Sequence, residues 1–451
     1  MILNQLFGFI TIKLMKYKST RGDSTELLFK DVVLSGVAKD DGLYVPTQGV
    51  IDLSSISGND YESLVRGVFI ATDDSSSELL ESSPLYKGFN KEPTPNLKEL
   101  SEDFYLMELF HGPTQSFKDY ALQVLGVLAD KQLGKIDRKG MALVATSGDT
   151  GSAAIHAVKD SENIDIVVLH PYKKISEYQR KQMTTIQSSN VTNFAIKGDY
   201  DDCQKLVKSL LSKQMGDKEL ISLNSINWIR VIAQSSYYVW LSQQIEGPFD
   251  VVVPSGNFGN AYSAWFAKNN GIPIENIICS TNTNNVLTRF INTGKLEPFE
   301  TVSSIAPSMD IQLPSSLERL IYDLFQDPSR TKIFYEELYK NGEASLPKNL
   351  IKDLQDTFQS DTFDDTNIKS SMKYISKNYD YIADPHTCTS ITLAQKLKNK
   401  NPIVAVATAS PVKFQGVVND VFDLQNDNSI KLAESFDIID NSLEKLIEKI
   451  F

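Results

Sequence analysis

One lysine of this sequence, Lys118, stands after a Gly-Pro turn and at the first position of a predicted helix. From residue 117 onward apolar residues recur at helical spacing, so one face of that helix is expected to be buried. The positive end of a helix and partial burial both disfavour an ammonium ion, and both lower the pKa of a lysine placed there. Such a lysine can form a Schiff base or remove a proton, which makes Lys118 the candidate catalytic residue. From this stretch alone, a solvated surface lysine is the alternative.

A second candidate is a glycine-rich loop that follows a short apolar run. Its two glycines permit a close backbone approach, so that successive N–H groups can surround a phosphate at the start of a helix. The loop lacks the lysine of a Walker loop and the three-glycine spacing of a dinucleotide site, which favours a monophosphate. A plain turn is the alternative. The residues concerned are Ser255, Gly256, Asn257, Phe258, Gly259 and Asn260.

A third loop has the same order of strand, glycine turn and helix. It could hold a second anion, either a carboxylate or a phosphate. The alternative is an ordinary helix N-cap, for which Ser147 or Asp149 would serve equally well. The loop consists of Thr146, Ser147, Gly148, Asp149 and Thr150 and runs on to Gly151.

These three features together favour pyridoxal phosphate chemistry over hydride or phosphoryl transfer. A lysine, a monophosphate loop and a second anion loop are what such a cofactor and an anionic substrate require. A serine hydrolase fits less well, because the sequence has no Gly-x-Ser-x-Gly elbow.

The elements that would position these loops follow the pattern of a parallel sheet covered by helices. Short apolar runs alternate with helical stretches, and ligands of such sheets bind beyond the carboxyl ends of the strands. We predict strands at residues 141–146, 164–170, 191–196, 250–254, 276–280 and 403–408. We predict helices at residues 25–37, 175–187, 201–215, 261–269, over most of 314–378, and at the end of 432–451.

Length, charge and composition bound the class of protein. A chain of 451 residues is expected to form two or three domains with a ligand site between them. A net charge of −12 argues against nucleic acid as a partner, and no apolar run approaches the ~20 residues of a membrane-spanning helix. Three scattered cysteines and four unclustered histidines predict a reducing, cytoplasmic location and no metal site. Residues 1–14 lack the features of a secretory signal, so we expect Met15 to be the native start.

The ordered set of motifs resembles the threonine synthase family, in its bacterial and fungal branch, from Met15 to about Val418. Residues 111–119 match HGPT-x-x-FKD, residues 145–151 match ATSGDTG, and residues 255–259 match SGNFG. Further matches are STRG at 19–22, GLYVP at 42–46, GDYDDCQ at 198–204, LNSINW at 223–228 and DPHT at 384–387.

The resemblance implies an α/β fold of fold type II, similar to the tryptophan synthase β subunit, with open, mainly parallel sheets and pyridoxal 5'-phosphate in the cleft between domains. Lys118 would carry the cofactor, residues 255–260 would hold its phosphate, and Thr408 would meet its pyridine nitrogen. The implied reaction converts O-phosphohomoserine and water to L-threonine and phosphate. The loop at residues 146–150 would bind the substrate carboxylate, while Asn227 and Arg230 would reach its phosphate.

One departure from the family pattern keeps alternatives open. The family reads T-A-H-P-A-K-F near its C-terminus, whereas residues 408–414 carry Ser410 in place of the histidine. A phospho-lyase that turns the same substrate into 2-oxobutyrate, and a catalytically silent pyridoxal-phosphate-binding protein, are therefore the other interpretations.

We expect an extension at residues 1–15, an N-terminal domain at 16–100 and two α/β domains at 101–245 and 246–451. The Schiff-base lysine and the substrate loop would belong to the first α/β domain, and the cofactor phosphate loop to the second. The assembly is expected to be a monomer or a homodimer.

Overall fold

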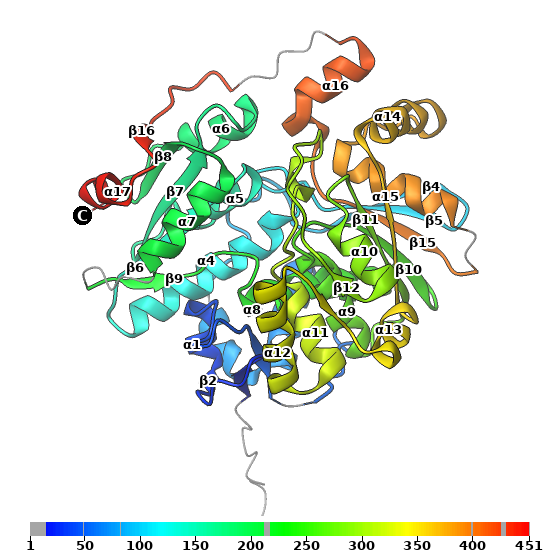
Figure 1. Ribbon diagram of the computed structural model, residues 1–451, viewed down its shortest axis with the longest axis horizontal. Coiled ribbons are helices and arrows are strands. Elements are labelled where there is room, and N and C mark those ends of the chain that lie inside the picture. Colours follow the sequence, from blue (N-terminus) through cyan, green and yellow to red (C-terminus); the bar gives the residue numbers. More distant parts are fainter. Residues whose placement is uncertain are drawn as a thin grey trace, which may run out of the picture.

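Two helix-covered sheets dominate the computed structural model (Figure 1). It describes residues 15–450 except 48, 82, 212–216, 398–399 and 425–429. The predicted start at Met15 and the end of the helix predicted at 201–215 therefore adjoin or fall on residues outside the description. No helix of the described residues combines the length and apolar character needed to cross a bilayer.

The first sheet has five parallel strands in the order β16-β8-β7-β6-β9. Alternate side chains point to opposite faces, as Leu143 and Val144 do: the first packs with α7 and α17, the second with α4 and α5. The strands are β6 (Gly140–Ala145), β7 (Ile164–Pro171), β8 (Val191–Lys197), β9 (Glu219–Ile221) and β16 (Asp437–Asp440). The helices around it are α4 (Lys118–Lys135), α5 (Asp149–Val158), α6 (Glu177–Thr184), α7 (Tyr200–Leu211) and α17 (Leu443–Ile450).

The second sheet has six strands in the order β14-β11-β10-β15-β5-β4, parallel except for the antiparallel edge strand β4. The strands are β4 (Asn96–Ser101), β5 (Phe104–Glu108), β10 (Phe249–Pro254), β11 (Ile274–Thr281), β14 (Phe358–Thr362) and β15 (Ile403–Ala407). The helices α14 (Asp365–Tyr379) and α15 (Pro385–Lys396) cover one face, and α8 (Trp228–Ser242), α9 (Gly259–Asn269) and α10 (Val286–Thr293) pack on the other.

The remaining elements are short or lie at the edges of these layers. They are β12 (Lys295–Leu296), β13 (Ala344–Ser345), α11 (Leu317–Phe325), α12 (Pro328–Asn341), α13 (Lys348–Gln355), α16 (Gln415–Phe422) and the 3-10 turns η2 (Pro307–Met309) and η3 (Pro411–Phe414). The helix-rich section predicted at 314–378 is thus α11 to α14, interrupted by two strands.

The N-terminal region corrects one prediction. A single helix was expected at residues 25–37, but Leu27 and Leu28 pair as a strand with Tyr17 and Lys16, and the helix is confined to α1 (Phe29–Leu34). The hydrogen bonds of this pairing outcompete the helical pattern of apolar residues. The region comprises β1 (Lys16–Ser19), β2 (Leu27–Leu28), β3 (Tyr44–Pro46), α2 (Tyr61–Thr72), η1 (Asp74–Ser76) and α3 (Ser77–Leu80).

The motifs at residues 19–22 and 384–387 each contain a residue with a structural role. Arg21 forms a bidentate ion pair with Glu318 at 3.0 and 2.7 Å, which ties the N-terminal region to α11. Asp384 accepts hydrogen bonds from the N–H groups of His386 and Thr387, and it caps α15 directly before Pro385.

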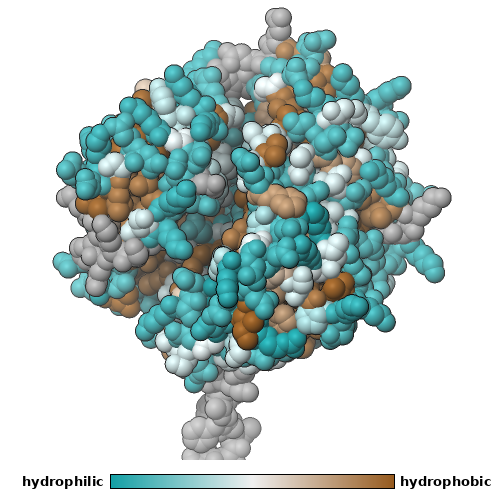
Figure 2. Space-filling view, viewed as in Figure 1, coloured by the Kyte–Doolittle hydropathy of each residue, from teal (hydrophilic) through white to brown (hydrophobic). Residues whose placement is uncertain are grey.

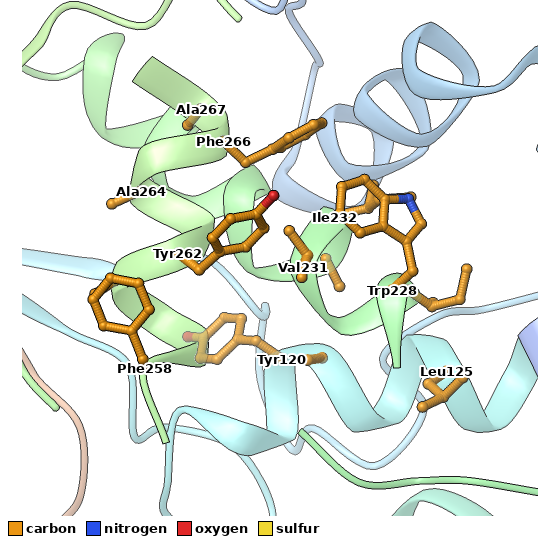
Figure 3. Packing of buried hydrophobic residues seen from close by; sticks show 14 of the residues in the cluster. Tyr120, Leu125, Trp228, Val231, Ile232, Phe258, Tyr262, Ala264, Phe266 and Ala267 are labelled. Carbon is orange, nitrogen blue, oxygen red and sulfur yellow. The ribbon is translucent and has the colours of Figure 1, made fainter. Parts of the chain in front are cut away.

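The starts of α4 and α9 are held by the main core. Figure 3 shows Tyr120 of α4 beside the helices that carry Trp228 and Tyr262. Trp228 meets the ring of Phe266 at 5.3 Å, edge to face, and all four side chains are buried. Tyr120 near the start of α4 and Phe258 directly before α9 are both buried, so packing fixes the two helix starts on which the candidate residues lie.

Candidate functional site

One buried cavity gathers most of the predicted site residues where the two sheets meet. The molecule is hollowed between its two lobes in the space-filling view (Figure 2). The predicted residues that line the cavity are Lys118, Asp149, Thr150, Arg230, Ser255, Gly256, Asn257, Phe258, Gly259, Asn260 and Thr408. Thr146, Ser147, Gly148 and Asn227 are not among the lining residues.

Lys118 is the first residue of α4, and its side chain is only 13% exposed. The alternative of a solvated surface lysine is therefore wrong. Burial lowers the pKa of Lys118, and the nearby charges of Lys413 and Arg230 lower it further. The carboxylate of Asp149, 3.4 Å from the lysine Nζ, opposes this effect.

The turn before Lys118 is fixed by hydrogen bonds within and beyond it. Asp119 accepts from the backbone N–H and the hydroxyl of Thr114, and burial raises the pKa of Asp119 to about 6. The N–H of Phe117 donates to the carbonyl of Thr408 at 2.9 Å. The end of β15 and the start of α4 are thus joined directly.

The loop at 255–260 has the backbone that a phosphate site requires. Phe258 adopts a left-handed conformation, with φ of 65°, immediately before α9. A Cβ added at Gly256 would lie 2.6 Å from the carbonyl oxygen of Ser308, so only glycine fits there. Asn260 accepts from the hydroxyls of Tyr237 and Tyr238, while its own buried amide nitrogen has no protein partner.

The loop at 146–150 is closed by Thr146 rather than by the expected Ser147 or Asp149. The hydroxyl of Thr146 accepts from the N–H groups of Gly148 and Gly151, both at 2.9 Å. Gly148 has a φ of 137°, which favours glycine. Ser147 lines a second cavity, so the residues of this loop line two different cavities.

Asp149 is the most connected side chain of the cavity. Its Oδ1 accepts from Gln179 at 2.9 Å and lies 3.0 Å from the Nζ of Lys413. Its Oδ2 accepts from the hydroxyl of Ser308 at 3.0 Å and faces Lys118. Among the groups that lower the pKa of Asp149, the ammonium of Lys413 has the largest effect.

Arg230 is a buried cation that faces the cavity. Its Nε has no partner, its NH1 reaches the carbonyl of Leu223 at 3.5 Å, and burial lowers its pKa to about 10. No carboxylate pairs with Arg230 in the part of the chain that the structure describes. An anionic ligand would therefore find an uncompensated guanidinium.

Asn227 has a different environment. Its amide oxygen caps α8 by accepting from the N–H of Ile229, and its nitrogen donates to the carbonyls of Val33 and Ser222. Its hydrogen-bonding groups are used within the protein, which does not fit the predicted contact with a substrate phosphate.

Comparison with known proteins agrees with this geometry. A family model described as Pyridoxal-phosphate dependent enzyme matches residues 84–337, and one described as Threonine synthase N terminus matches residues 16–78. The threonine synthase of Pseudomonas aeruginosa is 36% identical over 422 residues, which cover 90% of both chains. That of Saccharomyces cerevisiae is 32% identical and covers 95% of this chain and 93% of its own length. The chain belongs to the threonine synthase family.

A solved structure extends the agreement to three dimensions. The crystal structure of pyridoxal-phosphate-bound threonine synthase from Brucella melitensis matches with a TM-score of 0.89 at 30% identity, covering 97% of this chain and 98% of that one. The predicted family, fold type and cofactor are confirmed.

The residues present fit the cofactor of the threonine synthase family. The unpartnered amide of Asn260 and the glycine at 256 leave room and a donor for a phosphate at the start of α9. The hydroxyl-bearing Thr408 lines the same cavity as Lys118. A lysine, a phosphate loop and a hydroxyl therefore surround one space.

Three residues of the cavity region were given no role in the sequence analysis. Ser308 contacts Asp149 and gives its N–H to the Nε2 of His386. His386, one of four histidines without an assigned role in the sequence, lines the cavity and is oriented by Asp384 at 2.8 Å. Lys413 carried a signal, since it lies in the motif at 408–414, whereas nothing in the sequence indicated Ser308.

Ser410, which replaces the family histidine, lies outside the cavity lining. Its hydroxyl accepts from the N–H of Val412 at 3.4 Å and caps η3, and its own N–H donates to the carbonyl of Gln115. In this structure Ser410 shapes the turn that follows Thr408.

Proposed function

We propose that this protein is a threonine synthase that converts O-phosphohomoserine and water into L-threonine and inorganic phosphate. The observation that carries the proposal is the single cavity that unites a buried lysine, a phosphate-type loop and an unpaired arginine. Membership of the threonine synthase family supports it.

In this proposal Lys118 would carry pyridoxal phosphate, and residues 255–260 would hold the cofactor phosphate through backbone N–H groups and the amide of Asn260. The hydroxyl of Thr408, which lines the same cavity, would face the pyridine nitrogen. A hydroxyl there would leave that nitrogen largely unprotonated, so the ring would be a milder electron sink than beside a carboxylate.

The bound cofactor would withdraw electrons from the substrate carbon that carries the amino group, which makes its proton acidic. The amine of Lys118 would remove that proton and a second one from the neighbouring carbon, phosphate would leave the carbon beyond it, and that third carbon would take up a proton. Water would then add its hydroxyl at the middle carbon, and Lys118 would return a proton to the carbon that carries the amino group. Its lowered pKa makes the unprotonated amine of Lys118 more available as a base than that of an exposed lysine.

The substrate's two anionic ends would bind on different sides of Lys118. We propose the N–H groups at the start of α5, next to Thr150, for the carboxylate, and Arg230 for the phosphate. Support for Arg230 is its planar guanidinium, which is buried without a carboxylate partner among the described residues. Asn227 is left out of this proposal because its amide caps α8.

The test is to incubate the pyridoxal-phosphate-loaded protein with O-phosphohomoserine, identify products by proton NMR and measure released phosphate. We expect equimolar threonine and phosphate, and none of either with Lys118→Ala. Lys135→Ala is the matched control, since Lys135 ends the same helix but is exposed and paired with Glu78. It should retain wild-type turnover.

Other products would overturn the proposal in different ways. Phosphate with 2-oxobutyrate would identify the phospho-lyase. Cofactor binding without turnover would identify a silent binder. A cofactor absorbance unchanged in Lys118→Ala would refute the attachment to Lys118.

We further propose that the enzyme works in the cytoplasm, as a monomer or a homodimer. Support for the location is that all three cysteines are buried free thiols, as expected in a reducing compartment.

A further inference from the structure

The cavity contains a carboxylate that is shared by two lysines. Lys118 and Lys413 contact different oxygens of Asp149, at 3.4 and 3.0 Å. Asp149 is buried, so the charge balance among these three groups decides which lysine is held as an ammonium ion.

The groups around the Nζ of Lys413 suit an ammonium ion. Its side chain is fully buried, and its Nζ donates to the carbonyl of Thr114 at 2.6 Å and to the Oε1 of Gln182 at 2.9 Å, in addition to its contact with Asp149. Two of the ammonium's donors thus have hydrogen-bond acceptors, and its charge is paired with the carboxylate of Asp149. Lys118, by contrast, has Asp149 as its one charged acceptor among the described residues.

The other charged groups near Lys118 do not compete for this role. Arg230 adds a positive charge. The Nδ1 of His386 is hydrogen-bonded to Asp384 and its Nε2 accepts from the N–H of Ser308, while the carboxylate of Asp119 accepts from the N–H and hydroxyl of Thr114. Asp149 is therefore the negative charge that could hold Lys118 as an ammonium ion.

We propose that Lys413 is a positioning residue that neutralises Asp149, so that the carboxylate does not trap the amine of Lys118 in its charged form. The proposal rests on the proposed function, because it assigns cofactor attachment to Lys118. Lys413 touches neither the cofactor nor the substrate in this role; it acts through Asp149.

The role can be measured in cofactor capture, before any turnover. The neutral amine of Lys118 adds to the cofactor's aldehyde carbon, a C=N bond replaces C=O, and the oxygen leaves as water with both amine protons. Only the unprotonated amine reacts, so the rate at a given pH reports the protonation of Lys118.

The experiment follows the absorbance of pyridoxal phosphate mixed with apoprotein between pH 6 and pH 10. In Lys413→Met, Lys118 is the one lysine left beside Asp149. We expect the midpoint of the plot of capture rate against pH to rise by about one pH unit, and the capture rate at pH 7 to fall about tenfold. The double variant Lys413→Met with Asp149→Asn removes both charges and should return the midpoint to near the wild-type value. Lys413→Arg should also retain it.

Two controls separate this role from a structural one. Arg21→Met removes another buried cation–carboxylate pair, whose two residues do not line the cavity, and should lower stability without moving the midpoint. Where Lys413→Met fails to fold, Lys413→Gln supplies the same loss of charge with a donor in place.

Borohydride reduction fixes the bound cofactor to its lysine as a permanent label, and peptide mapping shows which lysine carries it. A label on a residue other than Lys118 would refute the proposed function. Label on Lys118 with an equal midpoint in wild type and Lys413→Met, or a midpoint that stays raised in the double variant, would refute the role of Lys413.

Discussion

At the scale of single residues, the cavity contains buried charged side chains of two kinds, those with an oppositely charged partner and those without one. Arg230 is buried with no carboxylate among the described residues, whereas Asp149 contacts two lysines. A buried charge without a partner costs folding free energy, and this cost supports the proposal that Arg230 binds a ligand of opposite charge.

Arg230 gives the first prediction. Arg230→Leu should lower kcat/KM for the phosphorylated substrate by about a hundredfold or more, because a charge-assisted bidentate contact is lost. Thermal unfolding should show equal or higher stability, since an uncompensated buried charge has been removed. Arg230→Lys should recover part of the activity. A change in kcat/KM of less than threefold in Arg230→Leu would exclude a contact with the substrate.

Ser410 gives the second prediction. Ser410→Ala removes the cap of η3 and should cost about 0.5–1 kcal/mol of the free energy of unfolding, measured by urea denaturation. The ratio of threonine to 2-oxobutyrate should stay that of the wild type, because the side chain lies outside the cavity lining. A changed product ratio would show that this position reaches the reacting groups.

At the scale of elements, loops are held in place by backbone conformations that a side chain would break. Gly148→Ala should reduce both activity and stability, the latter by about 1–3 kcal/mol, because its φ is 137° and a Cβ would lie 2.6 Å from Gln179. Gly416→Ala is the matched control: it lies within α16 with open space around it, and alanine should stabilise the helix slightly. Equal effects in the two variants would contradict the strain argument.

The elements also show what the sequence could predict. The strands expected at 141–146, 250–254 and 403–408 correspond to β6, β10 and β15 within one residue, because buried parallel strands read as continuous apolar runs. The helix expected at 25–37 is confined to residues 29–34, because residues 27 and 28 pair with β1, ten and twelve positions earlier in the chain.

Contacts between distant segments could not be predicted in the same way. Ser308 meets Asp149 across 159 residues, and Lys413 meets Gln182 across 231. Neither pair shares a local pattern, so only the folded chain brings them together. The order of the motifs in the sequence predicted which loops form the candidate site. The tertiary structure determines which of their side chains face the cavity.

At the scale of the whole molecule, buried carboxyls make stability depend on pH. Burial raises the pKa of Asp323 from 3.8 to about 6, between Trp265 and Tyr262, which both donate to it. The folded state therefore binds this proton more tightly than the unfolded state. Its contribution to stability is full below pH 3.8 and is lost as the pH rises through 6.

Asp323→Asn should remove this dependence. The variant's free energy of unfolding minus that of the wild type should increase by up to about 3 kcal/mol between pH 4 and pH 7. Urea denaturation across that range measures the difference. A difference that is constant with pH would refute the raised pKa.

The hydrogen bond between Phe117 and Thr408 has a consequence for the synthesis of the protein. It joins the turn that carries Lys118 to residues almost 300 positions later, and β5 pairs with β15 over the same interval. A ribosome must therefore translate the chain through residue 407 before β15 can enter its sheet. Nascent chains released before residue 403 lack this central strand and should be unable to retain pyridoxal phosphate, so cofactor binding would report that translation has passed this strand and that the sheet has formed.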